Sequence, residues 1–470
     1  MIFISLAILE LARHDIEITR FNVGQTPVAR YAVADAKGPA IVVAHGFAGS
    51  QQMMQGYALP LARAGYRVFV FEFLGHGRNS TPMSGDVSAV DGTTQLLMEQ
   101  VADVMNAVAP ESGPVALIGH SMATDILVRV AASRDDVGPL VLISAFSQQV
   151  DDRVPDDLLL VVGAWEPRLR RFAEDRLQMV DPEARAGDTA TNGIVLRRYV
   201  VAPFAEHVSV LQSRTGRRET LTWLDRAYGR TSDITILSTG WAILGLLGGL
   251  VMLFRPICRL LPKREIPHQS LSLGQTALVL TIPMLVAPVI AVTLDVDVLP
   301  VLVADYLALH MLVFGGVQLV LLRMWRIPAS SLAWPALGVL LLACALFGFA
   351  LDRYAANFWP TAERFWIIVA MMIGTLPYMT ADAILTANQT VFRRLWTRAS
   401  FLASLGIAVA LDFEGLFFLM LIAPVLFLFY VVFGAMGRDA SNRSGPLSSG
   451  LALGMVLAWA LGVSFPIFEA

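Results

Sequence analysis

Residues 114–123, with the sequence PVALIGHSMA, join a short apolar run to a serine that is flanked by small residues. A strand that ends in Gly-x-Ser-x-small and continues as a helix lifts the serine hydroxyl out of a tight bend, where a histidine can reach it. The stretch therefore predicts a strand, a sharp turn and a helix, with Ser121 placed as a nucleophile.

On both sides of this stretch the hydrophobic period alternates between that of strands and that of helices. Residues Asp15 to Ala34 alternate apolar and polar, which predicts an opening antiparallel pair. The further expected strands are Ile41–Ala44, Tyr66–Phe73, Val115–Ile118, Leu140–Ile143, Leu158–Val162 and Val195–Val201. The expected helices are Met53–Ala64, Thr94–Ala109, Ala123–Ala132 and Val208–Tyr228. Short apolar strands between helices are typical of an α/β fold with a doubly wound, mostly parallel sheet, which binds ligands at the carboxyl ends of its strands.

Composition divides the chain near Arg230. The 470 residues are 56% apolar, but apolar runs last four to eight residues before this point and about twenty after it. We therefore expect an α/β domain over residues 15–230 and a transmembrane helical domain over residues 231–470. Residues 1–14 form a short apolar segment, which Glu10 and Arg13 interrupt. A partial anchor, a surface-lying helix and the remnant of a longer start are all compatible with it.

Five motifs of the α/β domain occur in the order in which one enzyme family carries them. They are His45-Gly46-Phe47, Gly75-His76-Gly77-Arg78, Gly119-His120-Ser121-Met122-Ala123, Gly163-Ala164-Trp165-Glu166-Pro167 and Ala205-Glu206-His207-Val208. From about Asp15 to Arg230 the chain resembles the α/β-hydrolase family. The resemblance implies a Ser121 nucleophile, a His207 base and a Glu166 carboxylate that orients the imidazole. It also implies an oxyanion hole made by the backbone N–H groups of Phe47 and Met122.

Some positions leave alternatives open or depart from the family pattern. The family usually has aspartate as the acid, so four nearby aspartates compete with Glu166: Asp151, Asp152, Asp156 and Asp157. The histidines of the other motifs are expected to brace loops: His45, His76 and His120. Ala123 replaces the second glycine of the turn. Only residues 144–157 separate the strand at Leu140 from the strand at Leu158, too few for the lid that many of these enzymes insert there.

Eight apolar stretches follow the α/β domain and predict an all-α transmembrane bundle. They are Ile234–Phe254, Leu271–Leu294, Leu299–Leu322, Leu332–Leu351, Phe365–Thr386, Ala399–Leu411, Gly415–Met436 and Leu447–Phe468. The sixth is short, and it could form a hairpin with the seventh through Asp412 and Glu414. Seven and eight spans therefore both fit the sequence.

Charge in the gaps between these stretches alternates. Basic residues follow the first, third, fifth and seventh stretches: Arg255, Arg259, Lys263 and Arg264, then Arg323 and Arg326, then Arg393, Arg394 and Arg398, then Arg438 and Arg443. Two of the other gaps are acidic, with Asp295, Asp297, Asp412 and Glu414, and one is mixed. The positive-inside rule puts the basic gaps in the cytoplasm and the α/β domain on the opposite side, which is the periplasmic face of a bacterial inner membrane.

Three ionisable residues fall within the apolar stretches, namely Asp305, His310 and Asp382. Such groups face the bundle interior or water, either as a proton or ion path or as polar contacts that fix helix packing. The net charge of −3 offers no basic face for nucleic acid. Cys258 and Cys344 are spaced for neither a metal site nor a disulfide, and no metal or organic cofactor is expected.

These observations predict a membrane-integral serine hydrolase that cleaves carboxylic esters through an acyl-enzyme on Ser121, in contact with the lipid bilayer. A hydrophobic or lipid-like ester is the expected substrate. Two alternatives stay open at this stage: an acyltransferase that uses the same serine, and a transporter or scaffold in which the hydrolase fold is an accessory module.

Overall fold

The computed structural model describes residues 1–84, 90–108, 113–264, 271–294 and 296–469. Ala109 and Asp295, which entered the expectations above, lie outside the described residues. The chain forms two compact units. The first contains Met1–Leu246, Leu351–Asn357 and Pro466–Glu469, and the second contains Leu247–Ala350 and Phe358–Phe465.

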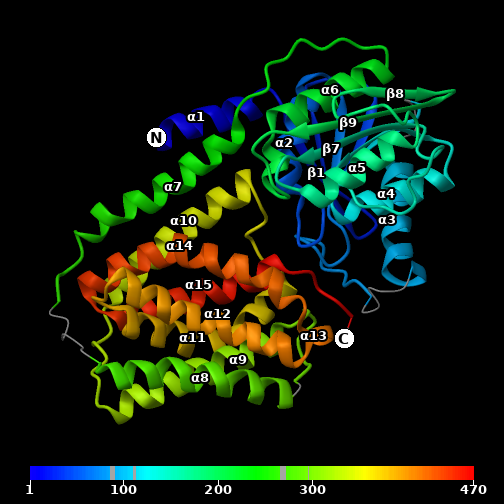
Figure 1. Ribbon diagram of the computed structural model, residues 1–470. Coiled ribbons are helices and arrows are strands. Elements are labelled where there is room, and N and C mark those ends of the chain that lie inside the picture. Colours follow the sequence, from blue (N-terminus) through cyan, green and yellow to red (C-terminus); the bar gives the residue numbers. More distant parts are fainter. Residues whose placement is uncertain (85–89, 109–112, 265–270, 295, 470) are drawn as a thin grey trace. The chain divides into compact units, whose positions relative to one another are not determined.

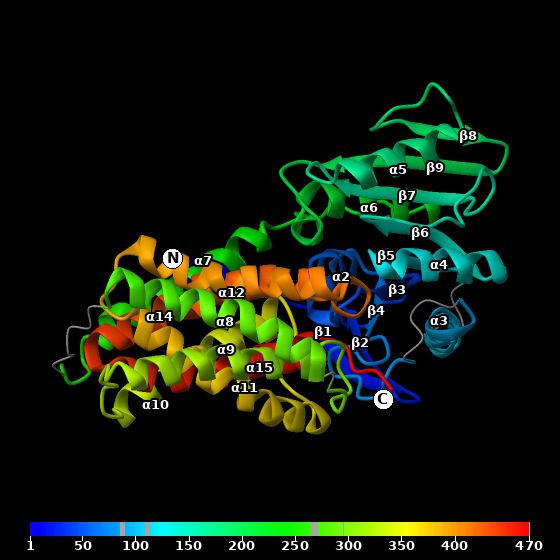
Figure 2. The ribbon, with the colours of Figure 1, turned by 60° about the horizontal axis from the view of Figure 1, so that its bottom comes forward.

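Within its described residues, the first unit contains a nine-stranded sheet in the order β1-β2-β4-β3-β5-β6-β7-β9-β8 (Figure 2). The strands are β1 (Glu17–Val23), β2 (Thr26–Ala32), β3 (Ala40–Ala44), β4 (Arg67–Phe71), β5 (Val115–His120), β6 (Val137–Ile143), β7 (Asp157–Gly163), β8 (Thr189–Asn192) and β9 (Val195–Ala202). The run from β4 to β9 is parallel, and antiparallel strands extend it at both edges. Its carboxyl ends therefore share one edge.

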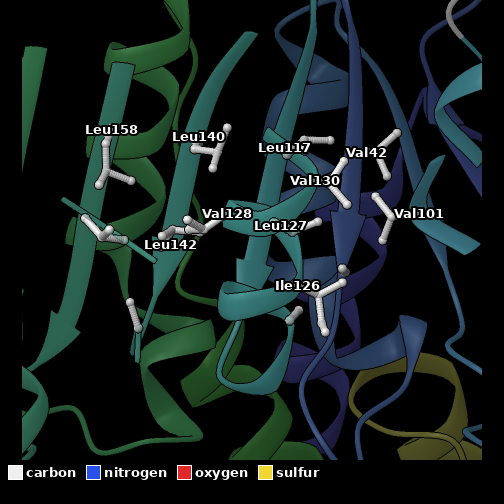
Figure 3. Packing of buried hydrophobic residues seen from close by; sticks show 14 of the residues in the cluster. Val42, Val101, Leu117, Ile126, Leu127, Val128, Val130, Leu140, Leu142 and Leu158 are labelled. Carbon is white, nitrogen blue, oxygen red and sulfur yellow. The ribbon is translucent and has the colours of Figure 1, made fainter. Parts of the chain in front are cut away.

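Helices cover both faces of this sheet because the central strands are apolar on both sides. On one face Val42, Leu117 and Leu142 pack against three helices. These are α3 (Gln95–Val108), α4 (Met122–Ser133) and α5 (Pro167–Gln178), and Figure 3 labels side chains of the first two helices. On the other face Val43 and Ile118 pack against α2 (Gln55–Arg63) and α6 (Arg214–Ala227). The predicted doubly wound, mostly parallel sheet is confirmed.

Several elements differ from the sequence prediction. Helix α5 was not expected, because its sequence is rich in arginine and only Ala173 and Leu177 are buried. The edge strand β8 has one buried residue and no apolar alternation. Two expected helices begin with a 3₁₀ turn: Gln51–Met54 (η1) precedes α2 and Ser209–Gln212 (η3) precedes α6. A further short helical turn, η2 (Val90–Thr94), precedes α3.

The N-terminal segment forms helix α1 (Ile2–Arg13), which belongs to the first unit. Its 12 residues are fewer than the roughly 20 that a helix needs to cross a bilayer. The Arg63 guanidinium donates to the carbonyls of Leu11 at 2.7 Å and His14 at 3.0 Å, so the end of α1 is held against α2.

Two short segments from the C-terminal half of the sequence are integral to the first unit. Asp352 accepts a hydrogen bond from Arg78 at 2.7 Å, and the Asn357 N–H donates to Ser50 Oγ at 3.0 Å. At the end of the chain, the Ile467 N–H donates to the Gly75 carbonyl at 2.9 Å, and Phe468 forms a parallel β-bridge with Met83. Both segments thus contact the loops that follow β3 and β4.

The second unit is all helical (Figure 1). The helices after α6 are α7 (Thr239–Cys258), α8 (Leu273–Leu294), α9 (Ala304–Met324), α10 (Trp334–Tyr354), α11 (Ala362–Thr386), α12 (Val391–Leu411), α13 (Phe413–Leu416), α14 (Leu419–Ser444) and α15 (Pro446–Ser464). Helix α11 packs between α9 and α15. A Cβ at Gly374 would lie 2.1 Å from the Ala308 carbonyl oxygen, so a small residue is what lets α9 and α11 approach.

Among the described residues, seven helices are long and apolar enough to cross a membrane, and the protein is an integral membrane protein. Helix α12 is not one of the seven, because three arginines lie in its first turns: Arg393, Arg394 and Arg398. The predicted sixth stretch, Ala399–Leu411, is the second half of this helix, which has 21 residues.

Candidate active site

Ser121 lies at the bend between β5 and α4. Its φ of 54° and ψ of −118° are unusual for a residue with a side chain, and they mark the strained turn that exposes a serine hydroxyl. Close packing of strand and helix favours glycine at position 119, where a Cβ would lie 2.7 Å from Leu127 Cδ1. Ala123 is accommodated in the first turn of α4 and is fully buried.

His207 follows β9 and lies between Ser121 and a carboxylate. Its Nε2 is 2.8 Å from Ser121 Oγ, and its Nδ1 is 2.6 Å from Glu166 Oε1. A carboxylate can only accept, so Nδ1 carries a proton and Nε2 of the neutral ring is free to accept the serine proton. The structure therefore brings together Ser121, His207 and Glu166, and their catalytic roles stay a prediction.

Glu166 follows β7 as the N-cap of α5, and its side chain is only 6% exposed. Its second oxygen, Oε2, accepts hydrogen bonds from Ser144 Oγ and from the Gly163 N–H, both at 2.7 Å. Burial on its own raises the pKa of Glu166, but the hydrogen bonds from His207, Ser144 and Gly163 outweigh it, and the pKa lies below the ordinary value. The carboxylate is thus ionised at neutral pH and fixed in orientation.

The four competing aspartates make other contacts or are exposed. Asp157 accepts from Arg226 at 2.6 Å, and Asp151 accepts the N–H groups of Arg153 and Val154 in its own turn. Asp152 and Asp156 are exposed. Ser144, which holds Glu166, was not predicted; its place directly after β6, at the same sheet edge as Ser121, is the signal that could have found it.

Two backbone N–H groups were predicted to form the oxyanion hole. Met122 is the first residue of α4, where an N–H has no acceptor within the helix. Phe47 follows Gly46, at which a Cβ would lie 2.9 Å from Ser121 Cβ. Only glycine allows the turn at residues 46–47 to approach the serine so closely, which favours the predicted role of the Phe47 N–H.

Buried polar groups brace this turn from behind. His45 Nδ1 donates to the Gly46 carbonyl at 2.8 Å, and its Nε2 accepts the Phe73 N–H at 3.2 Å. Glu72 was not predicted; its fully buried carboxylate accepts the Arg78 N–H at 2.8 Å, and burial raises its pKa. These contacts agree with a loop-bracing role for His45, and they join the loops after β3 and β4.

His120 positions the backbone of the base. Burial lowers the pKa of His120 to about 4, so the ring is neutral at pH 7. Its Nε2 lies 2.8 Å from the His207 carbonyl oxygen, which can only accept, so Nε2 carries the proton and donates. The residue beside the nucleophile thereby fixes the loop of the base.

Exposed apolar side chains lie close in sequence to Ser144, Glu166 and His207. Phe146, Trp165, Phe204 and Val208 are 52–83% exposed, and each lies within three positions of Ser144, Glu166 or His207. No cluster of three or more metal-ligating side chains occurs in the described part of the chain. The four exposed side chains offer apolar surface to a substrate close to the polar residues of the site.

The three ionisable residues of the predicted membrane stretches make polar contacts with their neighbours. Asp305 accepts the Leu299 N–H at 2.7 Å, and His310 lies 2.8 Å from Tyr306 Oη and 3.0 Å from Ser404 Oγ. Asp382 pairs with Arg398 at 3.2 Å. These short-range contacts favour the packing interpretation over a continuous proton path.

The first unit should lose stability in acid because two neutral histidines are buried in it. Burial lowers the pKa of both His45 and His120 to about 4, against about 6.5 in an unfolded chain. The unfolded chain therefore binds protons first as the pH falls. We expect the free energy of unfolding to be highest above pH 6.5. It should decline towards pH 4 by about 3 kcal/mol for each histidine.

The measurement is the apparent melting temperature of the full-length protein in detergent between pH 7.5 and pH 4. His120→Gln retains a donor towards His207 but takes up no proton, so its decline in acid should be smaller. His14→Gln is the control, since His14 is exposed. Equal pH dependence in His120→Gln and the unmodified protein would contradict the assignment.

Comparison with known proteins supports the fold of the first unit. Residues 39–189 match the family model described as the alpha/beta hydrolase fold. No curated protein matches the chain. Similar solved structures include a predicted CIB-like hydrolase from Thermoplasma acidophilum, at 17% identity and a TM-score of 0.35, over 45% of this chain and 98% of that one. A bacterial membrane phospholipase A is 15% identical with a TM-score of 0.34, over 48% of this chain and 90% of that one. At these identities and TM-scores the likeness carries no argument about substrate.

Proposed function

With the α/β-hydrolase fold of its first unit as the premise, we propose that this integral membrane protein is a serine hydrolase that cleaves carboxylic esters. The observation that carries the proposal is the hydrogen-bond chain from Ser121 through His207 to Glu166, with distances of 2.8 and 2.6 Å. An intact chain of this kind favours catalysis over an accessory role for the domain.

Acylation starts when the Ser121 oxygen attacks the ester carbonyl carbon and its proton passes to His207 Nε2. The negative charge that develops on the carbonyl oxygen is stabilised by the N–H groups of Phe47 and Met122. The tetrahedral intermediate then collapses: the bond to the alkoxy oxygen breaks, and the proton on His207 goes to the leaving alcohol. Glu166 stays ionised throughout and stabilises the positive imidazolium.

Deacylation repeats these steps with water as the nucleophile. His207 takes a proton from water, the hydroxide adds to the acyl carbon, and collapse returns the proton to Ser121 Oγ. An alcohol acceptor in place of water would give acyl transfer instead. The same residues serve both reactions.

The exposed apolar residues around the site support a hydrophobic or lipid-like ester. Phe146, Trp165 and Phe204 are 60%, 64% and 83% exposed, respectively. Burial of apolar surface by an acyl chain contributes about 25 cal/mol per Å². No helix lies between β6 and β7 in the described chain, where many relatives insert a lid, so these side chains are accessible.

Fluorophosphonate labelling tests the nucleophile. We expect the full-length protein to be labelled and Ser121→Ala to be unlabelled, because only the activated hydroxyl forms the covalent adduct. Ser147→Ala is the matched control, since its hydroxyl contacts Asp125 at 2.6 Å rather than the triad. Undiminished labelling of Ser121→Ala would refute the assignment, and ester products formed with an added alcohol would reveal acyl transfer.

Two substitutions at the acid test its orientation. Glu166→Gln should lower kcat for a p-nitrophenyl ester by about 10³- to 10⁴-fold, because a neutral amide stabilises the wrong tautomer of His207. Ser144→Ala removes one of the donors to Oε2 and should lower kcat about tenfold. A normal kcat in Glu166→Gln would contradict this role for Glu166. It would indicate that one of the aspartates at positions 151, 152, 156 or 157 orients His207.

We also propose that the hydrolase unit faces the periplasm of a bacterial inner membrane, on the side opposite the basic loops. The domain limits 1–14, 15–230 and 231–470 form part of this proposal.

The composition of the first unit supports eight crossings. Helix α7 starts from this unit. The unit also includes Leu351–Asn357, which begins in the last turn of α10, and Pro466–Glu469, which follows α15. Each return to the same side requires an even number of spans, so α12 has to cross as well.

Cysteine accessibility distinguishes eight spans from seven. In a background with Cys258 and Cys344 replaced by alanine, Asn388→Cys precedes α12 and Glu414→Cys follows it. Eight crossings put these two positions on opposite sides, so an impermeant maleimide should label only Glu414→Cys in intact cells. Labelling of both positions from one side would show that α12 does not cross, and labelling of Lys263→Cys from outside would reverse the orientation.

A further inference from the structure

A cavity of about 160 Å³ lies in the second unit, lined by residues of α11, α12, α14 and α15. An adjoining cavity of about 270 Å³ shares four residues with it, among them Arg394 and Arg438. Both cavities lie where α11 and α14 end and α12 begins. They belong to the end of the bundle that carries the basic loops.

Positive charge exceeds negative charge around these cavities. The cations are Arg255, Arg394, Arg398 and Arg438, against the carboxylates Asp382 and Asp439. Arg398 is balanced by Asp382, with two contacts of 3.2 and 3.3 Å. Arg394 donates only to the Thr390 carbonyl of its own helix among the contacts of the described residues, and Arg438 comes no closer than 3.9 Å to Asp439.

A buried hydroxyl in the same cavity also lacks a partner. Ser441 is 4% exposed, its Oγ has no hydrogen-bond partner among the described residues, and it lines the cavity of 160 Å³. A buried hydroxyl without a partner costs about 1–3 kcal/mol, so a ligand oxygen at this point would be stabilising.

Exposed aromatic side chains near the cavities favour a position at the level of lipid headgroups. Phe392 and Trp396 lie in the first turns of α12 and are 70% and 56% exposed. Tryptophan, such as Trp396, is enriched at the interface between hydrocarbon and water. Arg394 makes no ion pair among the described residues, and the nearest carboxylate oxygen to Arg438 is 3.9 Å away, on Asp439. Both guanidinium groups are therefore candidates for pairing with a phospholipid phosphate.

We propose that this pocket binds a phosphate group, supplied by the headgroup of an anionic phospholipid. Arg394 and Arg438 pair with the phosphate oxygens, and the Ser441 hydroxyl donates to one of them. Arg398 stays paired with Asp382. Gly434 allows this pair to lie against α14, because a Cβ there would be 3.2 Å from both terminal nitrogens of Arg398. The site is independent of the chemistry proposed at Ser121.

Native mass spectrometry of the full-length protein tests the proposal, with phosphatidylglycerol, phosphatidylcholine and glycerol 3-phosphate as separate probes. We expect phosphatidylglycerol to be retained and phosphatidylcholine to be lost. Arg394→Gln/Arg438→Gln should weaken phosphatidylglycerol binding about tenfold or more, because each charge-assisted hydrogen bond is strong in a partly dehydrated site. Arg394→Lys/Arg438→Lys keeps the charges and should restore most of the binding.

Arg323→Gln/Arg326→Gln is the matched control, since it removes two exposed charges outside these cavities. Each variant should elute as the unmodified protein does in size exclusion. Binding of glycerol 3-phosphate with the same dependence on Arg394 and Arg438 would support the phosphate site and assign it to a soluble ligand. Equal retention of phosphatidylglycerol by both glutamine variants, or no preference over phosphatidylcholine, would overturn the proposal.

Discussion

The fixed carboxylate of Glu166 is the interaction on which the rest of the candidate site depends. One of its oxygens orients His207, and the other is held by a hydroxyl from the end of β6 and an N–H from the end of β7. Because these donors belong to neighbouring parallel strands, the sheet itself sets the position of the acid. The imidazole then has one orientation relative to Ser121, and little reorganisation is needed when charge develops.

The same sheet edge connects the site to parts of the chain that are distant in sequence. The loop after β4 contacts Leu351–Asn357 through Arg78 and the chain end through Gly75. His76, in the same loop, lies edge-on to Phe47, with ring centroids 5.8 Å apart. The turn that carries the proposed oxyanion donor is therefore packed against a loop that two segments adjacent to membrane helices hold in place.

Sequence patterns predicted the α/β fold and most of its strands because the central strands are apolar on both faces and the motifs follow in one order. They missed α5 and β8, which bury too few residues to show a hydrophobic period. They also predicted only the second half of α12, because the arginines in its first turns interrupt the apolar stretch. At the site, motifs indicated Ser121, His207 and Glu166, which the structure brings together. Ser144 and Glu72 escaped notice because their partners are set by strand order and loop packing rather than by spacing in sequence.

The β-bridge between Met83 and Phe468 bears on the order in which the protein is made. Translation is vectorial, and an N-terminal domain usually folds before the rest of the chain emerges. Here the loop after β4 obtains its last backbone partners only when residues 466–469 leave the ribosome and α15 has been delivered to the bilayer. Insertion of the membrane helices is thus coupled to maturation of the hydrolase unit. A chain in which α15 is misinserted would lack the backbone partners of the loop after β4.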